Sequence, residues 1–305
     1  MPTKGPPTRK PQPLTPRAAS LALLASSLWG GNLVAIKYGY LMFPPFWSAW
    51  WRFLLGTLAV AVWARFQSVS LNIKPRERKP LFYLSAVFTL QIILLNTGAE
   101  LTSPAYAVVI LNAHPVFSNL LGHFVDSENR LTRARLLGLG LAFAGICYAV
   151  AGRPVETLAP SPIAGNLMLA ASAFLLASRT IYTRRIIQSI NPLRAVVWQG
   201  FGSLPVFLIL AWALEPPLRG KLAWGPVLAI LYQGPVIAGC CFIIWTLLLR
   251  RHSAGTLAMF AFTVPFFGIG LSALIFGEPI TAHILVAVGL VTAGIAIVTR
   301  PEKRA

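Results

Sequence analysis

Long apolar segments dominate the sequence, and they limit the possible folds more than any other feature. A helix needs about 20 mainly apolar residues to cross a bilayer. Ten segments meet this requirement, near 18–38, 45–65, 81–101, 104–124, 133–152, 163–183, 193–213, 224–249, 254–276 and 282–299. The connections between them are short, so we expect no inserted soluble domain. The sequence therefore predicts an all-α polytopic membrane protein with ten transmembrane helices.

The charged residues support this class and indicate the partners. Only 11% of the 305 residues are charged, whereas a typical soluble domain has about 25%. The net charge is +18, and the basic residues lie in short stretches between apolar runs. Such loops suit anionic lipid headgroups and give no reason to expect nucleic acid. We therefore expect membrane lipids as partners. The composition excludes a typical soluble enzyme and a disordered protein.

The distribution of Lys and Arg predicts the orientation. With the N-terminus in the cytoplasm, the inner loops and tails hold twenty of these residues, and the outer loops hold three: Arg153, Arg219 and Lys221. Cytoplasmic loops carry an excess of Lys and Arg. We expect a multi-pass protein of a bacterial inner membrane, with both termini in the cytoplasm. The termini form short cytoplasmic tails at 1–17 and 301–305, and the first of these is expected to be disordered.

The two halves of the chain are similar in sequence. A shift of 150 residues aligns Pro115 with Pro265 and Glu128 with Glu278. The alignment predicts two homologous five-helix repeats, at 18–153 and 163–300. Because five is odd, the repeats must enter the membrane from opposite sides, an arrangement typical of secondary transporters. A duplicated bundle without transport activity is the alternative.

Two motifs carry a family resemblance. The first-span segment SLWGGNLVAIK at 27–37 and the second-span segment WWRFLLG at 50–56 resemble EamA-type members of the drug/metabolite transporter superfamily. The repeated order of a mid-helix Pro, then Glu, then Gly-x-x-x-Ala-Gly-Ile also resembles that family. The resemblance implies two five-helix repeats and the export or exchange of small metabolites, often amino acids. It also implies a cavity between spans 3, 4, 8 and 9, which spans 1, 2, 6 and 7 bound. One departure from the family pattern is Gln199, which aligns with Arg52. The resemblance does not imply the identity of the cargo.

The matched prolines point to a binding site. Pro115 and Pro265 fall near the centres of their spans. A proline removes one helical hydrogen bond and frees a carbonyl, which must find a partner or water within lipid. Paired helix interruptions are a good sequence pointer to a transporter's site, although a kink needed only for packing is the alternative.

Polar side chains in the fourth span form a predicted cavity lining. At about 100° per residue, Asn112, Pro115, Asn119 and His123 share one face. His114 projects about 200° away from Asn112, so we expect it to be a packing residue. Its ordinary pKa is near neutral, which leaves proton coupling as the alternative role.

Charged residues in the first three spans need partners, because an unpaired charge in a membrane is costly. Glu100 is the only acid embedded on the outer side of the first half, so we expect an Arg52–Glu100 ion pair. Lys37 is expected to reach the interface or to share Glu100. The alternative is that Arg52 binds a substrate carboxylate, which its planar guanidinium suits. Arg179 is expected to extend to the inner interface.

Aromatic side chains beside amides can stack on an amphipathic metabolite and hydrogen-bond to it. With the polar residues above, this argument gives the predicted substrate-binding set: Trp29, Asn32, Arg52, Asn96, Asn112, Asn119, Trp198, Gln199, Tyr232 and Gln233. The cargo is expected to be a small-molecule metabolite.

The sequence lacks the usual signatures of catalysis and of ATP use. It has no Walker-type phosphate loop, no CxxC, no HExxH and no Gly-x-Ser-x-Gly. We therefore predict no cofactor, metal site or catalytic residue. The interpretation is a secondary transporter, most simply an exporter working by alternating access. The alternatives are a polytopic enzyme acting on lipid, for which His123, Asp126 and Glu128 form the only cluster, and a non-transporting scaffold.

Overall fold

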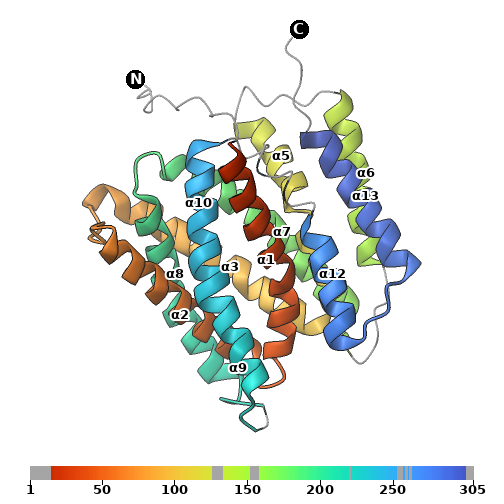
Figure 1. The fold of residues 1–305 in the computed structure, drawn as a ribbon, viewed down its shortest axis with the longest axis horizontal. Coiled ribbons are helices and arrows are strands. Elements are labelled where there is room, and N and C mark those ends of the chain that lie inside the picture. Colours follow the sequence, from red (N-terminus) through yellow and green to blue (C-terminus); the bar gives the residue numbers. More distant parts are fainter. Residues whose placement is uncertain are drawn as a thin grey trace.

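The computed structural model describes residues 15–125, 133–151, 158–219, 221–252, 257, 260 and 263–299. Within these residues every regular element is a helix, and the helices form one bundle (Figure 1). They group into ten spans: α1 (Pro16–Gly39); α2 (Pro45–Phe66); η1 (Pro75–Glu77) with α3 (Arg78–Leu101); α4 (Pro104–Leu111) with α5 (His114–Val125); α6 (Arg133–Val150); α7 (Pro162–Ile186); α8 (Pro192–Leu214); α9 (Trp224–Leu231) with the π-helix η3 (Tyr232–Cys241) and α10 (Phe242–Arg251); α12 (Thr263–Phe276); and α13 (Ala282–Thr299). The predicted all-α polytopic fold is confirmed.

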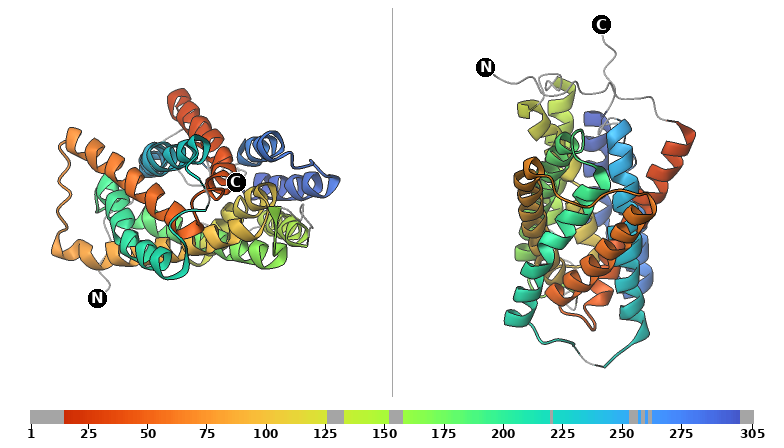
Figure 2. Two further views of the ribbon diagram at one scale, coloured as in Figure 1. Left: turned by 90° about the horizontal axis from the view of Figure 1, so that it is seen from below. Right: turned by 90° about the vertical axis from the view of Figure 1, so that its left-hand side faces the viewer.

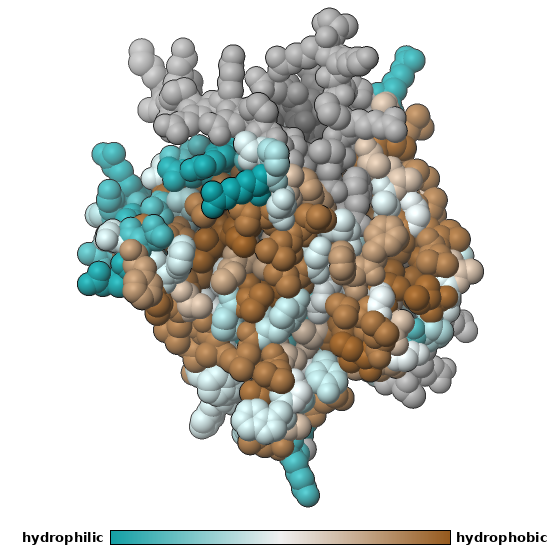
Figure 3. Space-filling view, viewed as in Figure 1, coloured by the Kyte–Doolittle hydropathy of each residue, from teal (hydrophilic) through white to brown (hydrophobic). Residues whose placement is uncertain are grey.

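The helices are apolar and present large apolar side chains outward. Among the described residues, six segments are long and apolar enough to cross a membrane, and three further apolar helices are shorter. Phe82, Trp212 and Leu274 are each about four-fifths exposed, at 78%, 78% and 82%. On the face that Figure 3 shows, apolar residues form a belt across the molecule, with most hydrophilic residues at its upper left and a few at its lower end. Such a belt fits contact with lipid tails, where only helices and closed barrels satisfy their backbone groups.

Proline residues begin many of the spans. Helices α1, α2, α4, α7 and α8 all carry Pro in their first two positions. The first N–H groups of a helix have no partner within the helix, so a proline there loses nothing. Side-chain caps add to this at Thr15, which accepts from the Ala18 N–H, and at Asn191, which accepts from the Leu193 N–H. The chain therefore turns sharply and starts a helix after each short connection.

The packing of the spans follows a two-fold pattern. α6 packs on α13 at one side of the bundle, and α2 packs on α8 at the other (Figure 1, Figure 2). The contact of α3 with α8 corresponds to that of α2 with η3, and the contact of α5 with α7 corresponds to that of α12 with α1. Exchanging the first five spans with the last five therefore maps the first two contacts onto themselves and each of the other contacts onto its counterpart.

Glycines allow close helix crossings at the centre. A Cβ placed on Gly268 of α12 would lie 2.5 Å from the Val108 side chain of α4, and one on Gly30 of α1 would lie 2.6 Å from the Phe267 Cβ. No larger residue fits these crossings without movement of a neighbouring helix. These close contacts let α12 cross α4, so spans 9 and 4 pack on each other.

The two ends of the bundle differ in charge. α1 begins and α13 ends at the same end, the upper one in Figure 1. We call it the basic end, because it carries the described residues Arg17, Arg65, Lys74, Arg76, Arg78, Lys79, Arg133, Arg184, Arg185, Arg194, Arg250 and Arg251. The opposite end carries Arg219 and Lys221 in its described loops.

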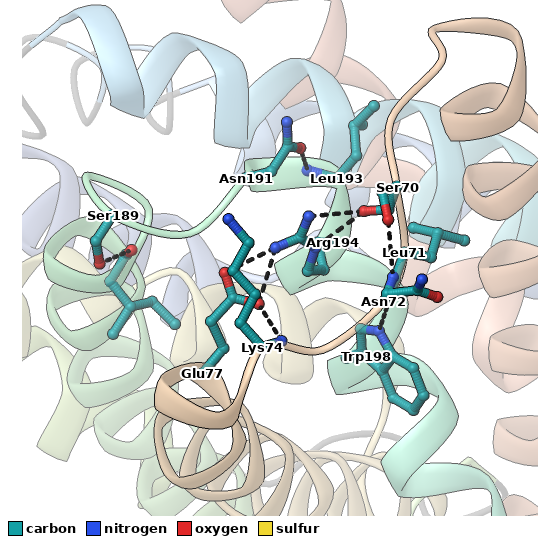
Figure 4. Close-up of polar contacts among 11 residues, drawn as sticks. Ser70, Leu71, Asn72, Lys74, Glu77, Ser189, Asn191, Leu193, Arg194 and Trp198 are labelled. Atoms are coloured by element: carbon teal, nitrogen blue, oxygen red, sulfur yellow. Dashed lines mark hydrogen bonds and ion pairs between the residues drawn. The ribbon is translucent and has the colours of Figure 1, made fainter.

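A polar cluster at the basic end fixes the connection between α2 and α3 (Figure 4). Arg194 Nη1 donates to both carboxylate oxygens of Glu77, at 2.7 and 2.8 Å, and its Nη2 donates to the Ser70 carbonyl at 2.8 Å. Trp198 Nε1 donates to the Leu71 carbonyl at 2.7 Å. These contacts join the first half of the chain to α8 in the second half.

Candidate functional site

A cavity of about 180 Å³ lies inside the bundle, between the two halves. Its walls come from α1, α2, α3, α4, α7, α8, η3 and α10, with His114 from α5 and Val264 from α12. Most of the wall is apolar. The polar or charged lining residues are Ser26, Asn32, Arg52, Gln91, Asn112, His114, Arg179, Thr180, Thr183, Gln199 and Thr246.

The cavity reaches the basic end of the bundle. Its lining includes Thr183 in the last turn of α7, Leu249 in the last turn of α10 and Ala195 in the first turn of α8. All three positions lie at the basic end. Toward the opposite end the lining stops before the terminal turns of the helices. Val108 of α4 and Leu95 of α3 are among the deepest lining residues.

Polar contacts close the opposite end. Lys37 Nζ donates to the carbonyl oxygens of Ala99, Glu100 and Thr102, at 3.2, 2.7 and 3.0 Å. These carbonyls lie at the end of α3 and in the residue that follows it, where a cation is favoured by the helix dipole. Lys37 therefore binds the backbone of Glu100 and does not share its carboxylate.

Glu278 joins the two halves at the same end. Its buried carboxylate accepts from the Ser103 hydroxyl, the Ala105 N–H and the Ser272 hydroxyl. Ser103 and Ala105 lie at the start of α4, whereas Ser272 lies in α12. One carboxylate thus ties span 4 to span 9.

Glu215 makes a similar contact between α8 and α2. Its carboxylate accepts from the Phe46 and Trp47 N–H groups, at 2.9 and 3.1 Å, and so caps the first turn of α2. Burial raises the pKa of the Glu215 carboxyl, although these two N–H donors act in the other direction. Sequence reasoning did not select Glu215, since its partners are backbone groups that are distant in sequence.

Arg52 faces the cavity, and the Arg52–Glu100 ion pair expected from the sequence does not form. Glu100 instead pairs with Arg219, at 2.6 Å. This loop arginine follows α8 and lies over the end of α3, which the sequence pattern could not show. The Arg52 side chain is buried, with 3% exposure, and its guanidinium lies 4.4 Å from the centre of the Phe53 ring.

Arg179 also faces the cavity, so the expectation that it extends to the interface was wrong. Its Nη1 donates to Gln199 Oε1 at 3.4 Å, and its guanidinium lies 4.9 Å from the Phe88 ring centre and 5.7 Å from that of Phe242. The aromatic side chains of α3 and α10 hold the cation inside the bundle.

The fourth span is broken beside Pro115. α4 ends at Leu111, Asn112 and Ala113 form a turn, and α5 begins at His114. Pro115 has no N–H to donate to the Leu111 carbonyl, and His114 Nδ1 lies 3.3 Å from that oxygen.

The break explains why Asn112 and His114 both line the cavity. The spacing of 100° per residue predicted that they would face apart, but that spacing does not continue through a turn. The side chains of Asn119 and His123, and the residues Asp126 and Glu128, lie outside what the structure describes.

The structure brings together some of the other predicted residues. Trp29, Asn32 and Gln199 line the cavity with Arg52 and Asn112, whereas four others lie away from it and bond elsewhere: Asn96 to Tyr40, Trp198 to Leu71, Tyr232 to Leu28 and Gln233 to Ala35. Pro265 lies in the first turn of α12 and follows the lining residue Val264 in the sequence.

Sequence reasoning missed several polar lining residues, among them Gln91 and Thr246. Gln91 is buried at the middle of α3, where it donates to the Ser172 hydroxyl at 3.0 Å. An amide at the centre of an apolar span is a signal that could have found it. The threonines give no such signal, because a helical threonine can bond to its own helix, as Thr246 does to the Phe242 carbonyl.

Comparison with known proteins places this architecture in a family. The model of the EamA-like transporter family matches twice, at residues 16–151 and 163–300. A probable amino-acid metabolite efflux pump of Salmonella typhimurium is 30% identical over 287 residues, covering 91% of this chain and 93% of that protein. A protein of the same description from Escherichia coli is 26% identical, and an uncharacterized transporter of Bacillus subtilis is 20% identical.

A solved crystal structure supports the fold. It has a TM-score of 0.69 and 19% identity, and the match covers 92% of this chain and 96% of that chain. The relatives are transporters and not enzymes, so the alternative of an enzyme acting on lipid is not supported. The match covers both halves and confirms the resemblance found in the sequence: the chain belongs to the EamA-like transporter family of membrane transporters.

Proposed function

We propose that the chain exports small metabolites across a bacterial inner membrane by alternating access, with the cargo bound in the central cavity. The observation that carries the proposal is a cavity that both halves enclose and that reaches only the basic end. Under the positive-inside rule the basic end faces the cytoplasm. Both termini are then cytoplasmic, and the structure is an inward-facing state.

The mechanism follows from the two repeats, at 18–153 and 163–300. Two halves of opposite orientation can exchange conformations, which turns an inward cavity into an outward one around a fixed site. In the inward-facing state the contacts of Lys37 and Glu278 hold the outer end closed. Release to the outside requires that these contacts break and that the basic end closes.

The lining residues suit a small amphipathic cargo. Trp29 can pack on an apolar part, while Asn32, Asn112 and Gln199 can bond to polar groups. The volume of about 180 Å³ is below the roughly 300–1,000 Å³ of sites for drug-sized ligands. The names of the relatives from Salmonella typhimurium and Escherichia coli support metabolites of amino acids as the class. His114, which faces the same cavity, is the candidate for proton coupling.

Transport by the purified chain in liposomes tests the proposal. Vesicles loaded with labelled amino acids or their N-acetyl derivatives should exchange them with external compound. Thr183→Trp places a large side chain at the mouth of the cavity and should abolish this exchange. Ser178→Trp is the matched control, because Ser178 lies on the same helix but does not line the cavity. If no compound moves, or if both variants act alike, the proposal fails.

A further inference from the structure

The charges of the cavity wall are of one sign. Its described lining contains two guanidinium groups, Arg52 and Arg179, and no Asp or Glu. Neither arginine has an ion pair with any carboxylate of the described residues. Buried charges in proteins are normally paired, so the wall lacks an anion.

The unpaired atoms of Arg52 form a recognition edge. Its Nε and Nη2 are buried and make no hydrogen bond in the described part of the chain. These two nitrogens lie on the same edge of the guanidinium, and that edge binds a carboxylate through two parallel hydrogen bonds. The Phe53 ring lies 4.4 Å away and stabilises the cation, but it leaves both donors free.

Arg179 places a second cation at another depth. Arg52 is seven residues from the start of α2 and Arg179 is seven from the end of α7, which puts each about 10 Å from its own end of the bundle at 1.5 Å per residue. Arg52 is therefore nearer the outer end, and Arg179 is nearer the basic end. Arg179 Nε is also buried without a hydrogen-bond partner among the described residues, and the bond from Nη1 to Gln199 is long at 3.4 Å.

We infer that the cargo is a small organic anion with a carboxylate and an apolar part. The inference rests on the proposed function and adds the charge of the substrate. A carboxylate supplies the missing partner for the free edge of Arg52, while Trp29, Phe53 and Phe242 line the apolar wall. Arg179 lies on the path between the basic end and Arg52, so it meets the anion first. An amino acid with a blocked amine fits this wall, whereas a cationic amide of the same side chain does not.

Three compounds with one side chain test the charge preference. N-acetyl-L-leucine is an anion, L-leucine is a zwitterion and L-leucinamide is a cation near neutral pH. Two readouts are needed: exchange in liposomes of neutral lipid, and the shift in melting temperature of the protein in detergent. We expect the acetylated compound to give the fastest exchange and the largest shift, and the amide to give neither.

Two variants and a matched control assign the effect to the cavity. Arg52→Gln and Arg179→Gln should each weaken exchange and binding of N-acetyl-L-leucine by about tenfold or more, because each leaves the anion without a partner. Arg185→Gln removes the same charge from an exposed position on α7 and should change neither readout. Arg52→Lys should recover part of the binding, but it cannot restore the two parallel bonds.

The outcomes separate this inference from the proposed function. If L-leucine or L-leucinamide moves as well as the acetylated compound, and both Gln variants transport normally, the anion inference is wrong while the transport proposal stands. If the acetylated compound raises the melting temperature through Arg52 but nothing crosses the membrane, the anion site stands and the transport proposal fails. If none of the three compounds binds or moves, both fail.

Discussion

At the scale of single residues, the partners of buried charges decide what the cavity can bind. The sequence shows that Arg52 lies inside a span, and it therefore poses a choice between an internal ion pair and a ligand. The choice depends on Arg219, a loop residue that pairs with Glu100 although the two are 119 positions apart in the sequence. Pairing across that distance follows from the order of the helices in space, which hydropathy does not encode.

Glu278 gives a prediction at this scale. Glu278→Ala leaves two hydroxyls and one buried N–H without their acceptor, and we expect a loss of about 1–3 kcal/mol of stability. Thermal unfolding in detergent would measure it. Glu100→Gln is the control at the same end, because its pair with Arg219 is partly exposed and should contribute less than about 1 kcal/mol. Equal shifts in the two variants would contradict the role given to Glu278.

At the scale of elements, the interruption of span 4 shapes the cavity. The sequence locates the break, since Pro115 and the neighbouring Asn112 are visible in it. It does not give the turn at Asn112 and Ala113, which brings Asn112 and His114 to the same wall. A periodicity argument assumes one continuous helix, and it fails where the helix ends.

Restoring that helix should impair transport without unfolding the protein. In Pro115→Ala the new N–H can donate to the Leu111 carbonyl, and α4 and α5 can then join. We expect transport to fall by about tenfold or more because the lining residues turn away from the cavity, an effect comparable to a small misplacement of binding groups. Transport and melting temperature, measured on the same preparation, check this. Normal transport would show that the break has no role in the site.

Close helix crossings give a second prediction for elements. Gly268→Val places a Cβ about 2.5 Å from the Val108 side chain, so α12 must move away from α4 and stability should fall by about 1–3 kcal/mol or more. Gly270→Ala is the matched control two residues later. Its Cβ would meet nothing within 4 Å, and the change should be neutral or stabilise by about 0.5–1 kcal/mol. Thermal unfolding of both variants distinguishes a crossing point from a general effect of glycine.

At the scale of the whole molecule, the number of helical spans could be predicted, because the length and hydropathy of the apolar segments determine it directly. Their lateral order could not, since it depends on which small residues meet, as Gly268 meets Val108. The candidate site was predicted in part. Five of the ten residues selected for it line one cavity, namely Trp29, Asn32, Arg52, Asn112 and Gln199, and their role in binding stays a prediction.

Accessibility to a thiol reagent tests the orientation of the molecule. In a variant without the native cysteines, Asn32→Cys should react with a membrane-impermeant reagent only from the cytoplasmic side, because the cavity reaches the basic end. Lys221→Cys should react only from the other side. Reaction of Asn32→Cys from the outside alone would mean that the orientation is reversed or that the resting state faces outward.

The single sign of charge in the cavity also has an electrical consequence. A bacterial membrane is negative inside, and its field acts on each elementary charge with about 2.3 kcal/mol per 100 mV across the full thickness. In the proposed export cycle the field draws Arg52 and Arg179 of the empty carrier inward, so voltage favours the state that accepts cargo from the cytoplasm. A bound carboxylate cancels part of that charge and lowers the cost of turning outward. The same field expels the freed anion, and voltage alone can then give the cycle its direction.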